Sequence, residues 1–394
     1  MSPDASALAL IDWTPWLRVV GLGLALACGP LAWVWLRHRQ ADVPQRLRAL
    51  TLLTLFLTFD LVLFGAFTRL TDSGLGCPDW PGCYGSASPL GAQADIHAAQ
   101  SAMPTGPVTH GKAWVEMVHR YLATGVGVLI TVLALGNGWA ARRDRAAVSP
   151  WWAALTLFWV CVQGAFGALT VTMKLYPAIV TGHLLGGLGL LVLLARQAEQ
   201  TRRATAPLPG RLRTGLWAVA GLTFVQVSLG AWVSTNYAVL ACSDFPTCQG
   251  QWLPPMDVAQ GFTLLRGLGE GADGGYLPFA ALTAIHWMHR LGALVLLLAL
   301  SAVVRALWRE GSAGARRAAT GLAAAGVWQL LTGLSNVVLG WPLLAAVAHT
   351  GGAAALVTWL TVCLVRSQAR PHLTLQKPQT SHASPVSPAS SARA

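Results

Sequence analysis

Long apolar runs alternate with short polar links along most of the chain. A run of about 20 apolar residues can cross the hydrocarbon core of a bilayer as a helix. The pattern predicts an all-α polytopic membrane protein with nine spans, at about 16–36, 50–70, 113–139, 151–172, 177–195, 214–235, 278–304, 319–338 and 342–365.

Charge distinguishes two kinds of link between these spans. Only 11% of the 394 residues are charged, and the basic ones gather in every second link, near 37–48, 142–145, 196–213 and 305–317. By the positive-inside rule these links are cytoplasmic, which places the N-terminus in the periplasm and the C-terminus in the cytoplasm of a bacterial inner membrane. The net charge of +12 then reflects topology and contact with anionic membrane lipid, and argues against a nucleic-acid partner.

The two ends of the chain call for separate interpretations. The first span lacks a basic segment before it, so we expect an uncleaved helix and not a signal peptide. The tail from about residue 367 is rich in Pro, Ser and Ala and is predicted to be disordered.

The chain carries an internal repeat of four motifs in the same order. "GAFTRLTDSGLGCPDWPGCYG" is answered by "GAWVSTNYAVLACSDFPTCQG", "EMVHRYLA" by "HWMHRLGA", "VQGAFGALTV" by "WQLLTGLSNVV", and "TGHLLGG" by "AHTGGAA". Each copy crosses the membrane an even number of times. The repeat therefore predicts two parallel-related four-helix-bundle halves plus one extra N-terminal transmembrane helix. The expected domains are 1–49, 50–200, 201–366 and the tail 367–394.

Histidines inside the spans are the leading candidates for chemistry, because ionisable groups within a membrane are costly and often functional. His119, His183, His289 and His349 lie roughly 9–17 Å from the outer helix ends at 1.5 Å per residue. Two histidines at similar depth on separate helices of each half suit bis-histidine ligation of a haem. The alternative for each is a hydrogen-bonded contact between helices. Zinc or copper is disfavoured, since further carboxylate or thiol ligands are missing nearby.

Small residues beside the histidines have two interpretations. The segments "GHLLGGLG" and "HTGGAAA" leave room for a flat macrocycle, or they allow close helix packing. Similarly, Arg120 and Arg290 either pair with haem propionates or extend to the lipid interface.

Glu116 distinguishes the two halves. It lies one helical turn before His119, and the matching position in the second half is His286. A buried carboxylate beside a haem could move protons or stabilise a cationic intermediate, and the alternative is an ion pair with a basic neighbour. We expect the first half to be chemically active and the second to hold a cofactor.

Four cysteines lie in the outer links, on the oxidising side of the membrane. Each pair, Cys77–Cys83 and Cys242–Cys248, is expected to close a seven-residue loop as a disulfide. A structural staple and a redox role both remain open. Cys28, Cys161 and Cys363 lie in or near spans and are expected to be inert packing residues.

Taken together, "RLTDSGLGCPDWPGC", "EMVHR", "GHLLGG", "HWMHRLGA" and "AHTGGAA" resemble the haem A synthase family, from about Leu50 to Val365. The resemblance implies an eight-helix bundle that oxidises the C8 methyl of haem O to a formyl group by successive hydroxylations, giving haem A for cytochrome oxidase. It implies that His119 and His183 face substrate haem O, and that His289 and His349 ligate haem b.

The resemblance further implies a catalytic role for Glu116 and a functional pair in Cys77 and Cys83. Haem O synthase and cytochrome oxidase assembly factors are the expected protein partners, and a homo-oligomer is left open. Two features depart from the family pattern: the extra first helix, and His286, which competes with His289 as a ligand. The rival functions are a di-haem electron carrier of the cytochrome b type and a haem transporter or chaperone.

Overall fold

A computed structural model describes residues 13–143, 149–200, 206–271 and 274–368, and this part of the chain is helical without a β-sheet. Nine of its helices are long and apolar enough to cross a membrane, which confirms the predicted number of spans. They are α1 Thr14–Arg37, α2 Val43–Leu70, α4 His110–Arg143, α5 Pro150–Thr172, α6 Pro177–Gln200, α7 Gly210–Thr235, α9 Phe279–Glu310, α10 Ala313–Val338 and α11 Leu343–Arg366.

Several helices continue beyond the apolar runs that predicted them. Helix α2 begins at Val43 because Asp42 caps it, accepting a 2.8 Å hydrogen bond from the N–H of Gln45. In the same way Ser312 caps α10 through the N–H of Ala315. Caps, and not the edge of the apolar run, therefore fix these helix ends.

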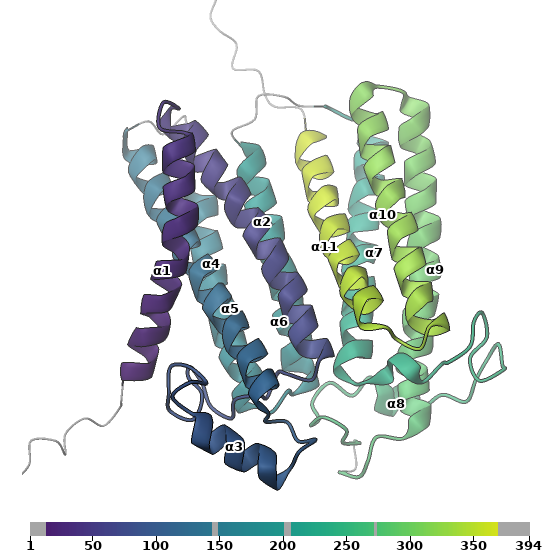
Figure 1. Cartoon of the computed structure of the whole chain (residues 1–394). Coiled ribbons are helices and arrows are strands. Elements are labelled where there is room, and N and C mark those ends of the chain that lie inside the picture. Colours follow the sequence, from purple (N-terminus) through teal and green to yellow (C-terminus); the bar gives the residue numbers. More distant parts are fainter. Residues whose placement is uncertain (1–12, 144–148, 201–205, 272–273, 369–394) are drawn as a thin grey trace, which may run out of the picture.

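The nine helices pack side by side in one bundle (Figure 1). Helix α2 contacts α4 and α6, and helix α5 also contacts both α4 and α6. Helix α9 contacts α7 and α10, and helix α11 likewise contacts α7 and α10. Helix α11 also contacts α2 and α6. Helix α1 packs mainly on α4.

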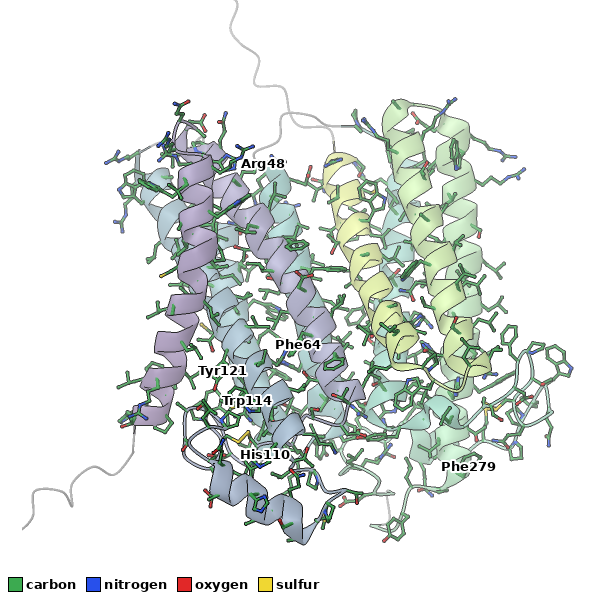
Figure 2. The ribbon with its side chains drawn as sticks, in the orientation of Figure 1. Arg48, Phe64, His110, Trp114, Tyr121 and Phe279 are labelled. Carbon is green, nitrogen blue, oxygen red and sulfur yellow. A yellow bond between two sulfur atoms is a disulfide. The ribbon has the colours of Figure 1, made fainter. Side chains whose placement is uncertain are left out.

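The links after α2 and α7 contain short helices that lie at one end of the bundle (Figure 1). These are α3 Gln93–Ala102, the 3₁₀ turn η2 Ala238–Leu240, and α8 Val258–Gly261. The sequence pattern did not predict them. In α3 the buried Ile96 belongs to the same apolar cluster as Met117 of α4, which fastens this link to the bundle. Figure 2 shows His110, Trp114 and Tyr121 on α4 near this end and Arg48 near the other.

The predicted tail begins at the end of the described residues. Ser367 closes α11, and residues 369–394 lie outside the described part of the chain.

Candidate functional site

The four candidate histidines form two pairs. His119 on α4 lies close enough to His183 on α6 for the rings to interact electrostatically, and His289 on α9 does the same with His349 on α11. All four keep some accessible surface although they lie inside the bundle, whereas His286 is only 4% exposed. The paired histidines are thus the ones that a bound group could reach.

Each paired histidine ring lies against a glycine of a neighbouring helix. A methyl group at Gly65 would lie 3.0 Å from Cε1 of His119, and one at Gly230 would lie 2.9 Å from Cε1 of His289. Gly167 and Gly333 face His183 and His349 at 3.6 and 3.1 Å. The same small-residue contact therefore recurs at all four histidines.

These glycines differ from those that the sequence singled out. On the histidines' own helices, Gly182 packs against Phe166, Gly186 against Gln163, and Gly352 against Trp328. Those positions serve close helix packing, as in the alternative interpretation. The glycines that make room for the rings stand on the opposing helices, a relationship that only the packing of the helices reveals.

The two pairs differ in what the Nδ1 atoms contact. Nδ1 of His289 lies 2.9 Å from Nε2 of Gln226, and Nδ1 of His349 lies 2.9 Å from the hydroxyl of Thr332. Among the described residues, the buried Nδ1 atoms of His119 and His183 have no hydrogen-bond partner. The ring of His119 instead stacks on Phe64, with centroids 6.2 Å apart.

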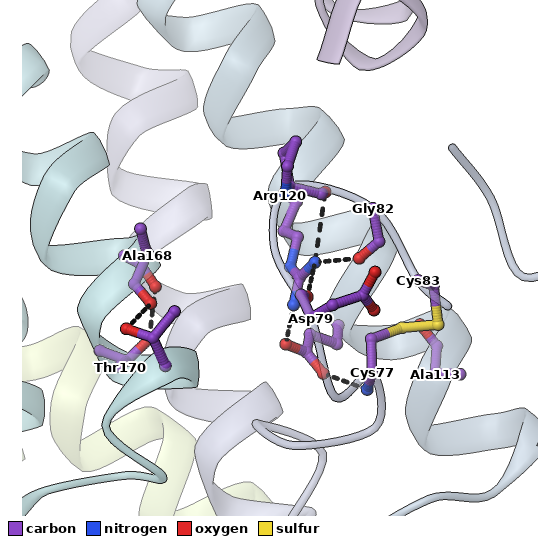
Figure 3. A network of polar contacts seen from close by, with 12 residues as sticks. Cys77, Asp79, Gly82, Cys83, Ala113, Arg120, Ala168 and Thr170 are labelled. Carbon is purple, nitrogen blue, oxygen red and sulfur yellow. Dashed lines mark hydrogen bonds and ion pairs between the residues drawn. A yellow bond between two sulfur atoms is a disulfide. The ribbon is translucent and has the colours of Figure 1, made fainter. Parts of the chain in front are cut away.

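Glu116 and Arg120 hold the first cysteine loop. Figure 3 shows Arg120 beside Asp79 and Gly82 of this loop. The N–H of Cys77 donates to Oε2 of Glu116 at 2.8 Å, and Arg120 donates to Oε1 at 2.5 Å. Arg120 also donates to the carbonyls of Asp79 and Gly82. Gly76 permits this close approach, because a side chain there would collide with the backbone of Lys112.

His286 and Arg290 hold the second loop in the corresponding way. Arg290 donates to the carbonyls of Cys242, Asp244 and Thr247, each at 2.8 Å. Its Nε lies 3.2 Å from Nε2 of His286, and the N–H of Cys242 lies 3.4 Å from Nδ1 of the same ring, which in its neutral form accepts a hydrogen bond at one of these two nitrogens. His286 thus faces the loop through Nδ1 and Arg290 through Nε2, in the place that Glu116 occupies in the first half.

Both predicted disulfides are present, joining Cys77 to Cys83 and Cys242 to Cys248. An aspartate inside each loop accepts two backbone N–H groups: Asp79 from Tyr84 and Gly85, and Asp244 from Gln249 and Gly250. The Thr247 hydroxyl, helped by these N–H groups, holds the pKa of Asp244 below its ordinary value.

The remaining cysteines divide between surface and interior. Cys363 is buried, as expected, but Cys28 and Cys161 lie exposed on the helix surfaces, so the packing prediction was wrong for those two.

The donor chemistry fits a haem better than a free metal ion. Within the described ranges, no three side chains of His, Cys, Asp or Glu gather to hold a metal ion. Two imidazoles on separate helices are instead a donor set that would suit a haem iron. The glycines beside the rings leave room for them, and the four histidines keep some accessible surface.

Comparison with known proteins identifies similar sequences over most of the chain. Residues 48–361 match the family model COX15-CtaA, described as "Cytochrome oxidase assembly protein". A "Heme A synthase" of Shewanella oneidensis is 38% identical over 314 residues, which cover 78% of this chain and 92% of that protein. A "Heme A synthase" of Methylobacterium sp. (strain 4-46) is 32% identical over 355 residues, covering 82% and 92%. The family match begins after α1.

Proposed function

Because this chain belongs to the COX15-CtaA family of haem A synthases, we propose that its two histidine pairs divide the work of that enzyme between a substrate site and a cofactor site. The enzyme is an oxidoreductase that converts haem O to haem A for cytochrome oxidase. Family membership favours this activity over the electron carrier and the haem transporter.

We place substrate haem O between His119 and His183, and haem b between His289 and His349. The observation that carries this assignment is the difference between the pairs. The carboxylate of Glu116 lies one turn from His119, whereas the second pair has hydrogen-bonded rings and no carboxylate at the matching position. A carboxylate suits proton handling, and fixed rings suit a permanent ligand set.

The proposed reaction at the first site is two successive two-electron oxidations of the C8 methyl by an external oxidant, each replacing a C–H by a C–OH, followed by loss of water from the resulting diol to leave the formyl group. His119 and His183 hold and orient the substrate. Glu116 holds or moves a proton beside it, and the Cys77–Cys83 loop covers the site and anchors Glu116. When bound, haem b supplies one-electron transfer beside this site.

His289, and not His286, is the proposed ligand in the second half. It faces His349 and keeps accessible surface, while His286 is committed to the cysteine loop. Arg120 and Arg290 directly follow the proposed ligands His119 and His289 in the sequence. We propose that these arginines assist binding of the haem propionates while they also hold the cysteine loops.

The architecture that supports this division is two parallel-related four-helix halves, 50–200 and 201–366, preceded by the extra helix of segment 1–49. The matching contacts of Glu116 and His286 with the two cysteine loops favour it. The arginine-rich links favour a periplasmic N-terminus and a cytoplasmic C-terminus in a bacterial inner membrane. Haem O synthase and cytochrome oxidase assembly factors are the proposed protein partners.

Haem extraction from the purified protein tests the assignment. We expect haem b together with haem A or a hydroxylated haem O. His119→Ala should remove the haem A products and keep haem b, whereas His289→Ala or His349→Ala should remove the bis-histidine optical signature of haem b. An unchanged spectrum in both second-half variants would overturn the assignment.

A further inference from the structure

The internal repeat allows the surroundings of each histidine to be compared position by position. Gly65 and Gly230 align α2 with α7, and Gln163 and Gln329 align α5 with α10. On this alignment Gln226, which contacts His289, corresponds to Leu61, and Thr332, which contacts His349, corresponds to Phe166. Both side chains that hydrogen-bond a ring in the second half are thus apolar in the first.

The hydrogen bonds of Thr332 determine which ring nitrogen of His349 carries the proton. Its hydroxyl donates its single hydrogen to the carbonyl of Trp328 at 2.7 Å. The 2.9 Å contact with Nδ1 of His349 therefore requires the ring to donate. A proton on Nδ1 leaves the lone pair of Nε2 free, and this is the tautomer that a ring needs to bind iron through Nε2.

Gln226 restrains the ring of His289 by a different contact. Its Nε2 lies 2.9 Å from Nδ1 and donates to the backbone carbonyl of His289 at 3.0 Å, while its Oε1 has no partner among the described residues. Because the same amide nitrogen donates to the backbone carbonyl of His289, it faces Nδ1 as a donor, so Gln226 restrains the rotation of the His289 ring and does not place a proton on Nδ1.

The first pair has no such support. Leu61 packs in an apolar cluster, Phe166 packs against Gly182, and Phe64 stacks on the ring of His119. Within the described residues the Nδ1 atoms of both rings remain unpartnered, so no hydrogen bond fixes their rotation or tautomer.

We propose that Gln226 and Thr332 are positioning residues that fix His289 and His349 for a permanently held haem, and that Leu61 and Phe166 leave His119 and His183 unrestrained so that the first site exchanges haem. The inference rests on the proposed function and deepens it. An exchanging site must release its product, and rings without fixed partners hold a ligand less tightly. Side chains that hydrogen-bond a metal-ligating ring typically contribute 10- to 100-fold in metal affinity.

The test uses the full chain purified in detergent, with apomyoglobin as the acceptor for released haem. Gln226→Leu and Thr332→Val install side chains without the hydrogen-bonding groups. We expect haem b to transfer to apomyoglobin about 10- to 100-fold faster in each variant. In Thr332→Val the midpoint potential should also rise, because the His349 ring loses its acceptor and becomes a weaker donor to iron(III). Thr332→Ser should restore the native rate.

Ser228→Ala on α7 and Ser335→Ala on α10 are matched controls. Both serines are half-buried and donate to carbonyls of their own helices, Phe224 and Leu331, each at 2.8 Å. We expect native haem retention and potential. The reciprocal pair Leu61→Gln with Phe166→Thr should slow haem release from the first site.

The outcomes separate the two proposals. If Gln226→Leu and Thr332→Val keep the native release rate and potential while His289→Ala loses haem b, the positioning role is overturned and the site assignment stands. If His289→Ala retains the bis-histidine spectrum, the assignment falls, and the inference falls with it.

Discussion

The backbone N–H of Cys77 donates a 2.8 Å hydrogen bond to the carboxylate of Glu116. This contact joins the stapled loop to α4 one helical turn from His119. The second half repeats it with a longer and weaker bond, 3.4 Å from the N–H of Cys242 to His286. The loop anchor is therefore shared by both halves, but only the first anchor is a carboxylate, and it stands at the proposed substrate site.

Replacing Glu116 with Gln keeps its shape and an acceptor for Cys77 but removes the charge. If the carboxylate handles a proton, haem A formation should fall about 100-fold or more, the usual scale for a lost acid–base group. Haem O or its hydroxylated product should accumulate. Haem extraction followed by chromatography measures both.

The matched control for Glu116→Gln is His286→Gln, which changes the anchor of the other loop. We expect haem A formation to remain close to native there. The haem b spectrum should be normal in Glu116→Gln, since its proposed ligands stand on α9 and α11. Haem A at the native rate in Glu116→Gln would mean that the carboxylate serves only as an ion-pair partner of Arg120.

The two cysteine loops should respond differently to removal of their disulfides. Closing a seven-residue loop contributes about 2 kcal/mol in the chain-entropy model, so Cys77→Ser with Cys83→Ser should loosen the loop that anchors Glu116. We expect haem A formation to drop while haem b stays bound. The corresponding pair, Cys242→Ser with Cys248→Ser, should leave the Glu116 anchor intact and reduce haem A formation less.

Peptide mapping of non-reduced native protein provides the reference for these variants. It should recover Cys77 joined to Cys83 and Cys242 joined to Cys248. Peptides that link one loop to the other, or free thiols at all four positions in protein from an oxidising compartment, would contradict the assignment.

The nine spans and both disulfides were predictable from the sequence, because apolar length and cysteine spacing are local properties. The two related halves and the roles of the four histidines stay predictions. The sequence pattern placed the start of α2 at residue 50, whereas the helix begins at Val43. Hydropathy marks the bilayer-spanning part of a helix, but backbone hydrogen bonds continue to the cap at Asp42.

The surroundings of the histidines were not predictable in the same way. Gly65 and Gly230 belonged to recognised motifs, yet their role depends on which helix faces which. Gln226 did carry a signal, a polar residue inside an apolar span, but its partner His289 lies 63 residues further along the chain. For Arg120 we expected a haem propionate or the lipid interface as its partner. Its observed partners are carbonyls of the cysteine loop, and these depend on the folded path of the loop.

The orientation of the bundle makes a separate prediction. A reporter fused to the N-terminus should read as periplasmic and one placed after Arg370 as cytoplasmic, because an odd number of spans separates them. Reporters in the α3 segment and in the link between α9 and α10 should read as periplasmic and cytoplasmic respectively. Both termini on one side would mean that α1 is cleaved or does not span the membrane.

Substituting the glycines that face the histidines tests whether the rings need this space, and it separates an effect on haem binding from an effect on protein stability. Gly230→Ala places a methyl group 2.9 Å from Cε1 of His289, so the ring must shift. Alanine is also favoured over glycine in a helix interior by about 1 kcal/mol, so α7 itself should not be weakened. We expect haem b occupancy to fall about 10-fold, the lower end of the effect of misplacing a ligand.

Gly221→Ala on the same helix meets no described atom within 4 Å and should keep haem b. Gly65→Ala, 3.0 Å from Cε1 of His119, should lower haem A formation and leave haem b unchanged. Absorption spectra and haem extraction measure haem occupancy, and the melting temperature measures the stability of each variant. Native occupancy in Gly230→Ala would show that His289 does not need this space to hold a haem.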